Sequence, residues 1–277
     1  MKFFAPAKLN LFLKINHKNR NGYHDIYSCA TFINLFDEIN IKFSKKNSII
    51  YKGKFSPPKG YFSKDIIKKI LLLLRNEEKK QRCLQIEIKK NIPYGAGLGG
   101  ASADAAAVLR GLRKMKILKK IMSKNELSKI GADIPMCLHS KNCLIQGIGE
   151  KISIVKIPKY YFILIKPNFS LSTRKIYSKF KTTINKKIIN KRRFSKSQII
   201  QLNNDLEKVV MKNYPIIKNI IMNLSRLENS VFNGMSGSGS SCYAAFNSLS
   251  HAKKAHKEII KKYPRYWSLI VRNISLN

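Results

Sequence analysis

The sequence predicts an α+β fold in two domains, and three observations support this prediction. Predicted strands and helices intermix along the chain without a repeating strand–helix–strand pattern, which favours α+β over a doubly wound parallel sheet. The chain has 277 residues, enough to bury a large core and most naturally to form two domains. No internal repeat is evident. We place the first domain at residues 1–155 and the second at residues 156–277.

The first predicted strand covers residues 6–15, where apolar side chains alternate with Lys8, Asn10, Phe12 and Lys14. Alternate side chains of a strand point to the same face, so Lys8 and Asn10 share a face. That face is either the solvated side of a strand or part of a site. The pattern alone leaves both interpretations open.

A second alternating segment, residues 84–89, predicts a strand that leads into a glycine-rich loop and an alanine-rich helix. The glycines at 95, 97, 99 and 100 remove side chains that would keep an anion from backbone N–H groups. The helix N-terminus adds unpaired donors and the positive end of the helix dipole. Ser102 falls in the first turn, where its hydroxyl could meet a phosphate oxygen or a metal ion. The loop therefore predicts a phosphate site.

The same loop partly matches two other nucleotide motifs. Gly95, Gly97 and Gly100 have the spacing of the dinucleotide fingerprint, which needs an acidic residue about twenty positions further on. The chain has Lys119 and Lys120 there, which disfavours a nicotinamide or flavin site. A P-loop is excluded because no Gly-Lys-Ser/Thr sequence follows the glycines.

Asp133 is a candidate functional residue between two predicted elements. Ser123 and Glu126 form a capping-box pattern that begins a short helix, with Leu127 and Ile130 facing inward. Asp133 falls just past the end of this helix, before an apolar residue and a proline. A carboxylate in this place is a turn former or a positioned base, and position alone does not choose between them.

The C-terminal part of the chain holds a second glycine-rich loop, residues 233–241. The elements predicted around it are a helix at 215–227, a buried strand at 242–246, a helix at 252–262 and a strand at 267–271. A tight connection between elements is one interpretation of the loop. Paired with the first loop it fits a kinase better, because phosphoryl transfer needs donors on several phosphate oxygens.

Six motifs occur together in a fixed order, namely residues 6–10, Arg20 to His24, 93–103, 131–135, 147–150 and 237–239. With them the chain resembles the galactose, homoserine, mevalonate and phosphomevalonate kinases, over about residues 5–246 and most weakly between about 176 and 200. The first two motifs resemble more specifically the members that act on a cytidine diphosphate-linked methylerythritol. A sister kinase for mevalonate or homoserine stays an alternative.

The resemblance implies the two-domain fold of these kinases, with the active cleft between the domains. It also implies ATP and Mg²⁺ as cofactors and phosphorylation of the 2-hydroxyl of the methylerythritol moiety, in the non-mevalonate isoprenoid pathway. Lys8 and Asp133 match the catalytic residues: Asp133 takes the hydroxyl proton and Lys8 stabilises the developing alkoxide.

The remaining site residues are likewise implied by the resemblance. The first loop would bind ATP through Pro93, Tyr94, Gly95, Ala96, Gly97, Leu98, Gly99, Gly100, Ala101, Ser102 and Ala103. The second loop contributes Gly237, Ser238 and Gly239. The substrate-binding candidates are Asn10, Tyr23, His24, Thr173, Tyr177 and Asp205, with Tyr23 and Tyr177 expected to stack on cytosine.

Three features depart from the family pattern. The helix before Asp133 is about four residues shorter than in the family. Because four residues are close to one helical turn, the direction in which Asp133 points is nearly preserved. The segment 181–196 is unusually basic, and we expect a solvated loop or an extended helix end. Asp104 follows the first loop, and an acidic group there would be tolerated beside phosphates if it faced a metal ion.

The net charge of +39, from 54 Lys and Arg against 15 Asp and Glu, raises nucleic-acid binding as an alternative of another class. The lysines are spread along the whole chain, so we expect no specific nucleic-acid partner. The five cysteines lack metal-ligand or redox-pair spacing and are expected to be reduced. With no signal sequence or long apolar segment evident, we expect a cytoplasmic protein without membrane contact, a monomer or a homodimer.

Overall fold

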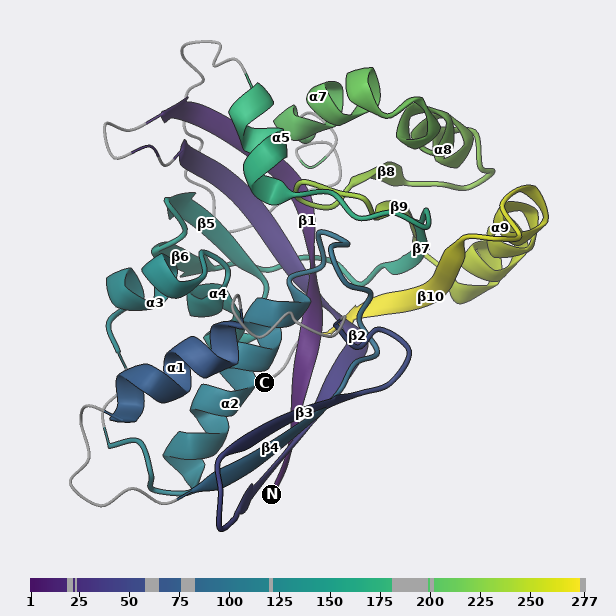
Figure 1. The fold of residues 1–277 in the computed structure, drawn as a ribbon. Coiled ribbons are helices and arrows are strands. Elements are labelled where there is room, and N and C mark those ends of the chain that lie inside the picture. The colour runs from purple at the N-terminus through teal and green to yellow at the C-terminus, as the bar shows by residue number, and fades with distance from the viewer. Residues whose placement is uncertain are drawn as a thin grey trace. The chain divides into compact units, whose positions relative to one another are not determined.

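The computed structural model in Figure 1 describes residues 1–18, 22, 24–57, 65–75, 83–119, 122–180, 199 and 202–274. The chain divides into two compact units. Unit 1 consists of Met1–Ala7, Leu35–Tyr94 and Gly99–Ser140, and unit 2 of Lys8–Asn34, Gly95–Leu98 and Lys141–Asn277. The units interleave in the sequence, because the long strands β1 (Lys2–Lys18) and β2 (His24–Phe43) contribute to both. The division into continuous domains, 1–155 and 156–277, stays a prediction.

In its described residues, unit 1 combines a small sheet with four helices. Strand β4 (Leu84–Lys89) pairs in parallel with β3 (Ser48–Lys52) and antiparallel with the end of β2, with Glu38 opposite Lys89. The helices are α1 (Ile66–Arg75), α2 (Gly100–Lys114), α3 (Lys124–Ile130) and α4 (Ile134–His139). Helix α2 contacts both α1 and α4, as Figure 1 shows.

Helix α2 packs closely on the strands of unit 1 because its buried face is made of small residues. Ala103 and Ala105–Ala107 are buried in it. At Gly111 a methyl group would lie 2.6 Å from Ile41 Cδ1 and 2.9 Å from Phe3 Cε2, so only glycine allows the helix to come this near. This packing fixes the N-terminal end of α2, where the first glycine loop arrives.

Unit 2 contains a sheet in the order β2-β10-β7-β9-β8, with antiparallel neighbours throughout. Its strands are β7 (Tyr161–Lys166), β8 (Phe232–Met235), β9 (Cys242–Phe246) and β10 (Trp267–Ile274). Strand β5 (Cys143–Gly147) pairs with β2 and with β6 (Lys151–Ile154). The helices are α5 (Thr173–Lys179), α7 (Asp205–Asn213), α8 (Pro215–Ser225) and α9 (Leu249–Lys262). Helix α9 packs on β7, β9 and β10.

Most of the predicted elements are confirmed. The predicted helix at 215–227 is α8, and its apolar residues Ile217, Ile220, Ile221 and Leu224 are buried. The capping box of Ser123 and Glu126 is present and begins α3. The predicted strands at 84–89 and 242–246 are β4 and β9, and the other two elements lie within α9 and β10. The basic segment 181–196 lies outside the described residues.

For the polar face of strand β1 the sequence left two interpretations open, and the structure excludes the solvated one. Lys8 and Asn10 are each only 4% exposed, like the apolar residues between them. Both faces are covered because residues far along the chain, such as Ser236, pack on this strand. Lys8 and Asn10 therefore belong to the interior of unit 2.

Candidate active site

The first glycine loop has the backbone shape of an anion cradle. Gly95, Gly97 and Gly99 have positive φ values of 59°, 73° and 70°, a conformation that glycine adopts without steric cost. Gly99 is the N-cap of α2 and has no side chain to occupy the N–H groups of the first turn. Ser102 lies half-buried in that turn. Glycines of this shape before a helix N-terminus suit a phosphate group.

The centre of this loop is held from within unit 2. Three consecutive carbonyl oxygens each accept a hydrogen bond: Ala96 O from Ser241 N at 3.1 Å, Gly97 O from the Ser236 hydroxyl at 2.9 Å, and Leu98 O from Lys8 N at 3.0 Å. The donors come from the second glycine loop and from β1. The two glycine loops predicted from the sequence therefore lie against each other.

The second loop connects β8 to β9 and is fixed by a buried amide. Asn204 Nδ2 donates to Met235 O at 2.8 Å and to Gly237 O at 2.7 Å. The hydroxyl groups of Ser238 and Thr173 lie 2.8 Å apart, within hydrogen-bond distance. Two predicted site residues, Thr173 and Ser238, are thus brought together by the structure.

Lys8 and Asn10 meet both glycine loops. Lys8 Nζ donates to Asn10 Oδ1, and Asn10 Nδ2 donates to the Ser28 hydroxyl at 2.9 Å, which fixes the orientation of the amide. A methyl group at Gly237 would lie 3.1 Å from Asn10 Oδ1, 3.3 Å from Lys8 Nζ and 3.5 Å from Gly97 O. A buried ammonium group is costly unless it has partners. Unit 2 therefore places one cation where two phosphate-type loops meet.

His24 and Tyr177 form an aromatic pair in unit 2. Their ring centroids are 5.2 Å apart with the planes inclined at 48°, and both residues are half-buried. Tyr177 comes from α5 and His24 from the first residue of β2. Tyr23 lies outside the described residues. The structure thus brings together two of the predicted substrate-binding residues.

Asp205 holds α7 to β1. One carboxylate oxygen accepts from Lys14 Nζ at 2.8 Å and the other accepts from Ile15 N at 3.0 Å. Lys14 Nζ also donates to Asn203 Oδ1. Both carboxylate oxygens of Asp205 therefore accept hydrogen bonds from β1, the strand that carries Lys8. Contact between Asp205 and the substrate stays a prediction.

Asp133 lies in unit 1, at the N-cap of the short helix α4. It follows the end of α3, as predicted, and its side chain is half-buried. Its carbonyl oxygen accepts from Cys137 N at 3.1 Å, and Pro135 occupies the first turn. Helix α4 itself was not predicted from the sequence.

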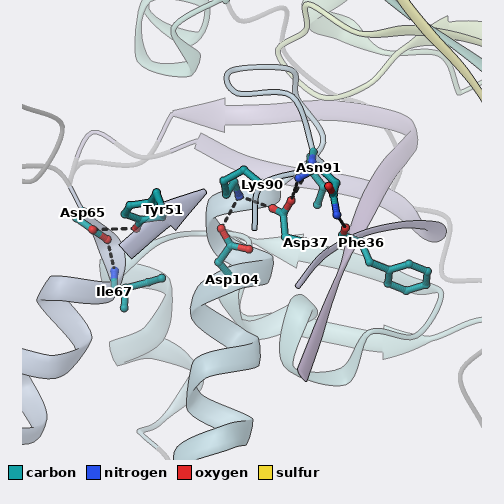
Figure 2. A network of polar contacts seen from close by, with 9 residues as sticks. Phe36, Asp37, Tyr51, Asp65, Ile67, Lys90, Asn91 and Asp104 are labelled. Carbon is teal, nitrogen blue, oxygen red and sulfur yellow. Dashed lines mark hydrogen bonds and ion pairs between the residues drawn. The ribbon is translucent and has the colours of Figure 1, made fainter. Parts of the chain in front are cut away.

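Two buried charged residues next to the first loop, Asp37 and Lys90, were not predicted from the sequence. Figure 2 shows Lys90 Nζ paired with both Asp37 Oδ2 and Asp104 Oδ2. The Asp104 carboxylate, for which the sequence left contact with a metal ion open, is buried and paired with Lys90 through Oδ2. A signal for Lys90 was present: Leu84, Ile86 and Ile88 alternate inward along β4, and the same period places residue 90 on the buried side.

Replacing Asp104 by asparagine is expected to remove a loss of stability that the wild type shows as the pH rises above about 4. Burial raises the pKa of the Asp104 carboxyl well above its usual range; the Lys90 ammonium lowers it and Asp37 raises it further. A carboxyl whose pKa is raised on folding loses stability as pH rises from its unfolded value of about 4 through its folded value. Asparagine has no such proton. Urea unfolding measured from pH 4 upward should show the free energy of unfolding of the variant rising relative to that of the wild type. A difference between the two proteins that stays constant with pH would contradict this prediction.

The five cysteines all lie in the described part of the chain. All five cysteines are free; Cys83 is half-buried and the others are buried. Burial raises the pKa of the Cys29 and Cys242 thiols well above their usual range, which makes them unreactive. None of the helices in the described part of the chain has the length and hydrophobicity needed to cross a bilayer.

Comparison with known proteins gives the family. The model of the GHMP kinases N terminal domain matches residues 65–149, and that of the GHMP kinases C terminal region matches residues 188–265. The chain is 34% identical over 263 residues to the 4-diphosphocytidyl-2-C-methyl-D-erythritol kinase of Ehrlichia chaffeensis, covering 92% of both chains. It is 34% identical over 281 residues to the enzyme of that name from Pelagibacter ubique, covering 99% of both.

Solved structures agree on the fold. The crystal structure of 4-(cytidine 5'-diphospho)-2C-methyl-D-erythritol kinase superposes with a TM-score of 0.78 at 23% identity, covering 98% of this chain and 99% of the other. The crystal structure of the mevalonate kinase of Methanococcus jannaschii superposes with a TM-score of 0.62 at 17% identity, covering 100% of this chain and 98% of the other. The predicted two-domain α+β kinase fold is confirmed. From the matched domains and the full-length relatives, the chain belongs to the GHMP kinase family and groups with its 4-diphosphocytidyl-2-C-methyl-D-erythritol kinases.

Proposed function

We propose that this chain transfers the γ-phosphoryl group of ATP to the 2-hydroxyl of 4-diphosphocytidyl-2-C-methyl-D-erythritol, in the non-mevalonate isoprenoid pathway and in the cytoplasm. Membership of the GHMP kinase family implies the use of ATP, and full-length relatives bear the name of this enzyme. The structural observation that carries the proposal is the meeting of Lys8 and Asn10 with Gly97 and Gly237 of the two glycine loops.

In the proposed reaction Asp133 acts as the general base. It takes the proton of the 2-hydroxyl while the oxygen forms a bond to the γ-phosphorus, and the bond from that phosphorus to the β-phosphate oxygen breaks to release ADP. The Lys8 ammonium stabilises the negative charge that develops on the attacking oxygen. Its buried, hydrogen-bonded setting strengthens this effect, because charges interact more strongly away from water.

ATP is proposed to bind the first loop, from Pro93 to Ala103, through backbone N–H groups at the start of α2. Gly237, Ser238 and Gly239 of the second loop supply further donors. Among the described residues no group of three or more His, Cys, Asp or Glu could hold a metal ion. Mg²⁺ typically uses one or two protein ligands together with substrate phosphates. The half-buried Ser102 hydroxyl is the proposed ligand, and Mg²⁺ would neutralise charge on the phosphates.

The cytidine end is proposed to bind at the aromatic pair of His24 and Tyr177, together with Tyr23. Aromatic rings hold a nucleobase by its face, and the His24 ring nitrogens can contact its edge. Thr173 lies at the start of the same helix as Tyr177 and is paired with Ser238, next to Gly237. Helix α5 thus links the proposed base site to the second loop.

The Tyr177→Leu variant is expected to raise the KM for the cytidine substrate about tenfold, since stacking on one base is worth about 1–3 kcal/mol. The KM for ATP should stay near its wild-type value. Tyr266→Leu is the matched control, because Tyr266 also stacks on a ring, that of Tyr263 at 5.6 Å and 11°, on another part of unit 2. Steady-state kinetics with each substrate varied in turn tests this, and equal effects of the two variants would remove Tyr177 from the base site.

The function itself is tested by ADP release from ATP and Mg²⁺ with three alcohols. Turnover with 4-diphosphocytidyl-2-C-methyl-D-erythritol, and not with mevalonate or homoserine, is the expected result. Turnover with mevalonate or homoserine instead would make the chain a sister kinase. No turnover with any alcohol, from a protein that binds ATP, would refute the proposed substrate.

A further inference from the structure

The two residues that lead into the first glycine loop are held by a fully buried carboxylate. Asp37 Oδ1 accepts Asn91 N–H at 2.6 Å and Ile92 N–H at 2.8 Å, and the side chain is 0% exposed. Figure 2 also shows Asn91 Nδ2 donating to Phe36 O at 2.8 Å. The end of β2 therefore fixes the path by which the chain leaves β4 towards Pro93.

Lys90 connects this carboxylate to α2. Only 8% of its side chain is exposed, and its Nζ pairs with Asp37 on one side and with Asp104 on the other (Figure 2). Asp104 belongs to the second turn of α2, which begins at Gly100. The Lys90 ammonium group thus connects Asp37, which holds the backbone of Asn91 and Ile92 before the loop, with Asp104 of α2 after the loop.

The backbone around Lys90 leaves little room for adjustment. Lys90 N donates to Lys52 O at 2.7 Å, and a methyl group at Gly53 would lie 2.8 Å from Lys90 O. A methyl group at Gly100 would lie 3.1 Å from Ile92 Cγ2 and 3.6 Å from Lys90 Nζ. Because the residues around Lys90 are packed so closely, a shift of its ammonium group would also shift Ile92 and Gly100 at the two ends of the loop.

We propose that Asp37, Lys90 and Asp104 are positioning residues for ATP, which set the spacing between the two ends of the first glycine loop. The inference rests on the proposed function only in that this loop binds ATP. The three residues act through the loop: they aim its backbone donors at the phosphates. Misplacing binding groups by about 1 Å can cost about 10²-fold in rate, so a rigid frame at the loop ends has a catalytic value.

The Asp37→Asn variant tests this in the full chain. The asparagine amide keeps one oxygen that can accept a hydrogen bond, but its NH₂ group cannot accept one. The variant therefore loses either the hydrogen bond from the Lys90 ammonium group or those from the two backbone N–H groups. We expect the KM and the Kd for ATP to rise about tenfold, close to the loss of one hydrogen bond to a charged group. The kcat at saturating ATP should change less, and the KM for the cytidine substrate should stay unchanged.

Asp65→Asn is the matched control, visible in the same view (Figure 2). Asp65 is also buried, at 2% exposed, and accepts from a backbone N–H, that of Ile67 at 2.8 Å, and from the Tyr51 hydroxyl at 2.8 Å. It caps α1, and its partners Tyr51 and Ile67 lie outside the first glycine loop. We expect it to lower the urea midpoint of unfolding as Asp37→Asn does, without moving the affinity for ATP.

Isothermal titration calorimetry measures the Kd for ATP of each variant and so tests the proposal independently of turnover. A raised Kd in Asp37→Asn but not in Asp65→Asn supports the proposal, and a Kd that is unchanged in the first or equally raised in both overturns it. If Asp37→Asn does not fold, Lys90→Arg replaces it, because it keeps the charge but changes the spacing; wild-type ATP affinity in that variant overturns the proposal. A wild type that binds ATP but phosphorylates none of the alcohols refutes the proposed function and leaves this test intact.

Discussion

The Asp133→Asn protein is expected to lose about 10²–10⁴-fold in kcat, the usual contribution of a positioned general base, while its affinity for ATP stays near the wild-type value. Asparagine has nearly the same shape as aspartate but cannot take the proton of the 2-hydroxyl. The ATP site is unaffected because the proposed phosphate donors belong to the glycine loops. The loss should therefore fall on turnover and not on nucleotide binding.

The position of Asp133 makes this test unusually clean. The Asp133 side chain makes no capping hydrogen bond to α4, so the substitution removes no cap and α4 should begin at the same residue in the variant. The measurement is ADP release with the cytidine substrate, beside titration of ATP into the same protein. Asp65→Asn again serves as the control for a substitution of the same type. Unchanged turnover would take the base role from Asp133, and a parallel loss of ATP binding would point to misfolding.

The local pattern of β1 predicted which residues share a face but not whether that face is buried. The alternation placed Lys8 beside Asn10, and the structure confirms this through their hydrogen bond. Burial depends on Ser28 of the neighbouring strand and on Ser236. Ser236 is more than 220 residues away in the sequence, and no local pattern reports such a partner. The sequence could therefore propose a site at β1 without distinguishing it from a solvated face.

The loop glycines were the most predictable part of the site, because their conformation is a local property. Gly95, Gly97 and Gly99 adopt the positive φ that a glycine-rich turn indicates. The frame around them was not predictable in the same way. The period of β4 turns Lys90 inward, but its partner Asp37 lies 53 residues earlier, and nothing near Asp37 marks it as charged and buried. Long-range pairs of this kind come from the tertiary fold.

The Gly97→Ala substitution is expected to abolish measurable ATP binding, raising the Kd at least about 100-fold, and to lower kcat with it. The added methyl group would lie 2.2 Å from Ser236 O and 2.9 Å from Gly239 O, so backbone atoms of the second loop must move away. Alanine also disfavours the φ of 73° by about 1–3 kcal/mol. Both loops would be displaced from the geometry in which their donors meet the phosphates.

Gly100→Ala is the matched comparison, because it adds the same methyl group three residues later in the same loop. Its nearest neighbour is a side-chain carbon, Ile92 Cγ2 at 3.1 Å, and Gly100 does not have the positive φ of Gly97. A rotating side chain can yield where a backbone carbonyl cannot, so we expect Gly100→Ala to weaken ATP binding by much less. Titration of ATP into both proteins, with circular dichroism to confirm folding, measures the difference. Equal affinities in the two variants would mean that the contact between the glycine loops does not shape the phosphate site.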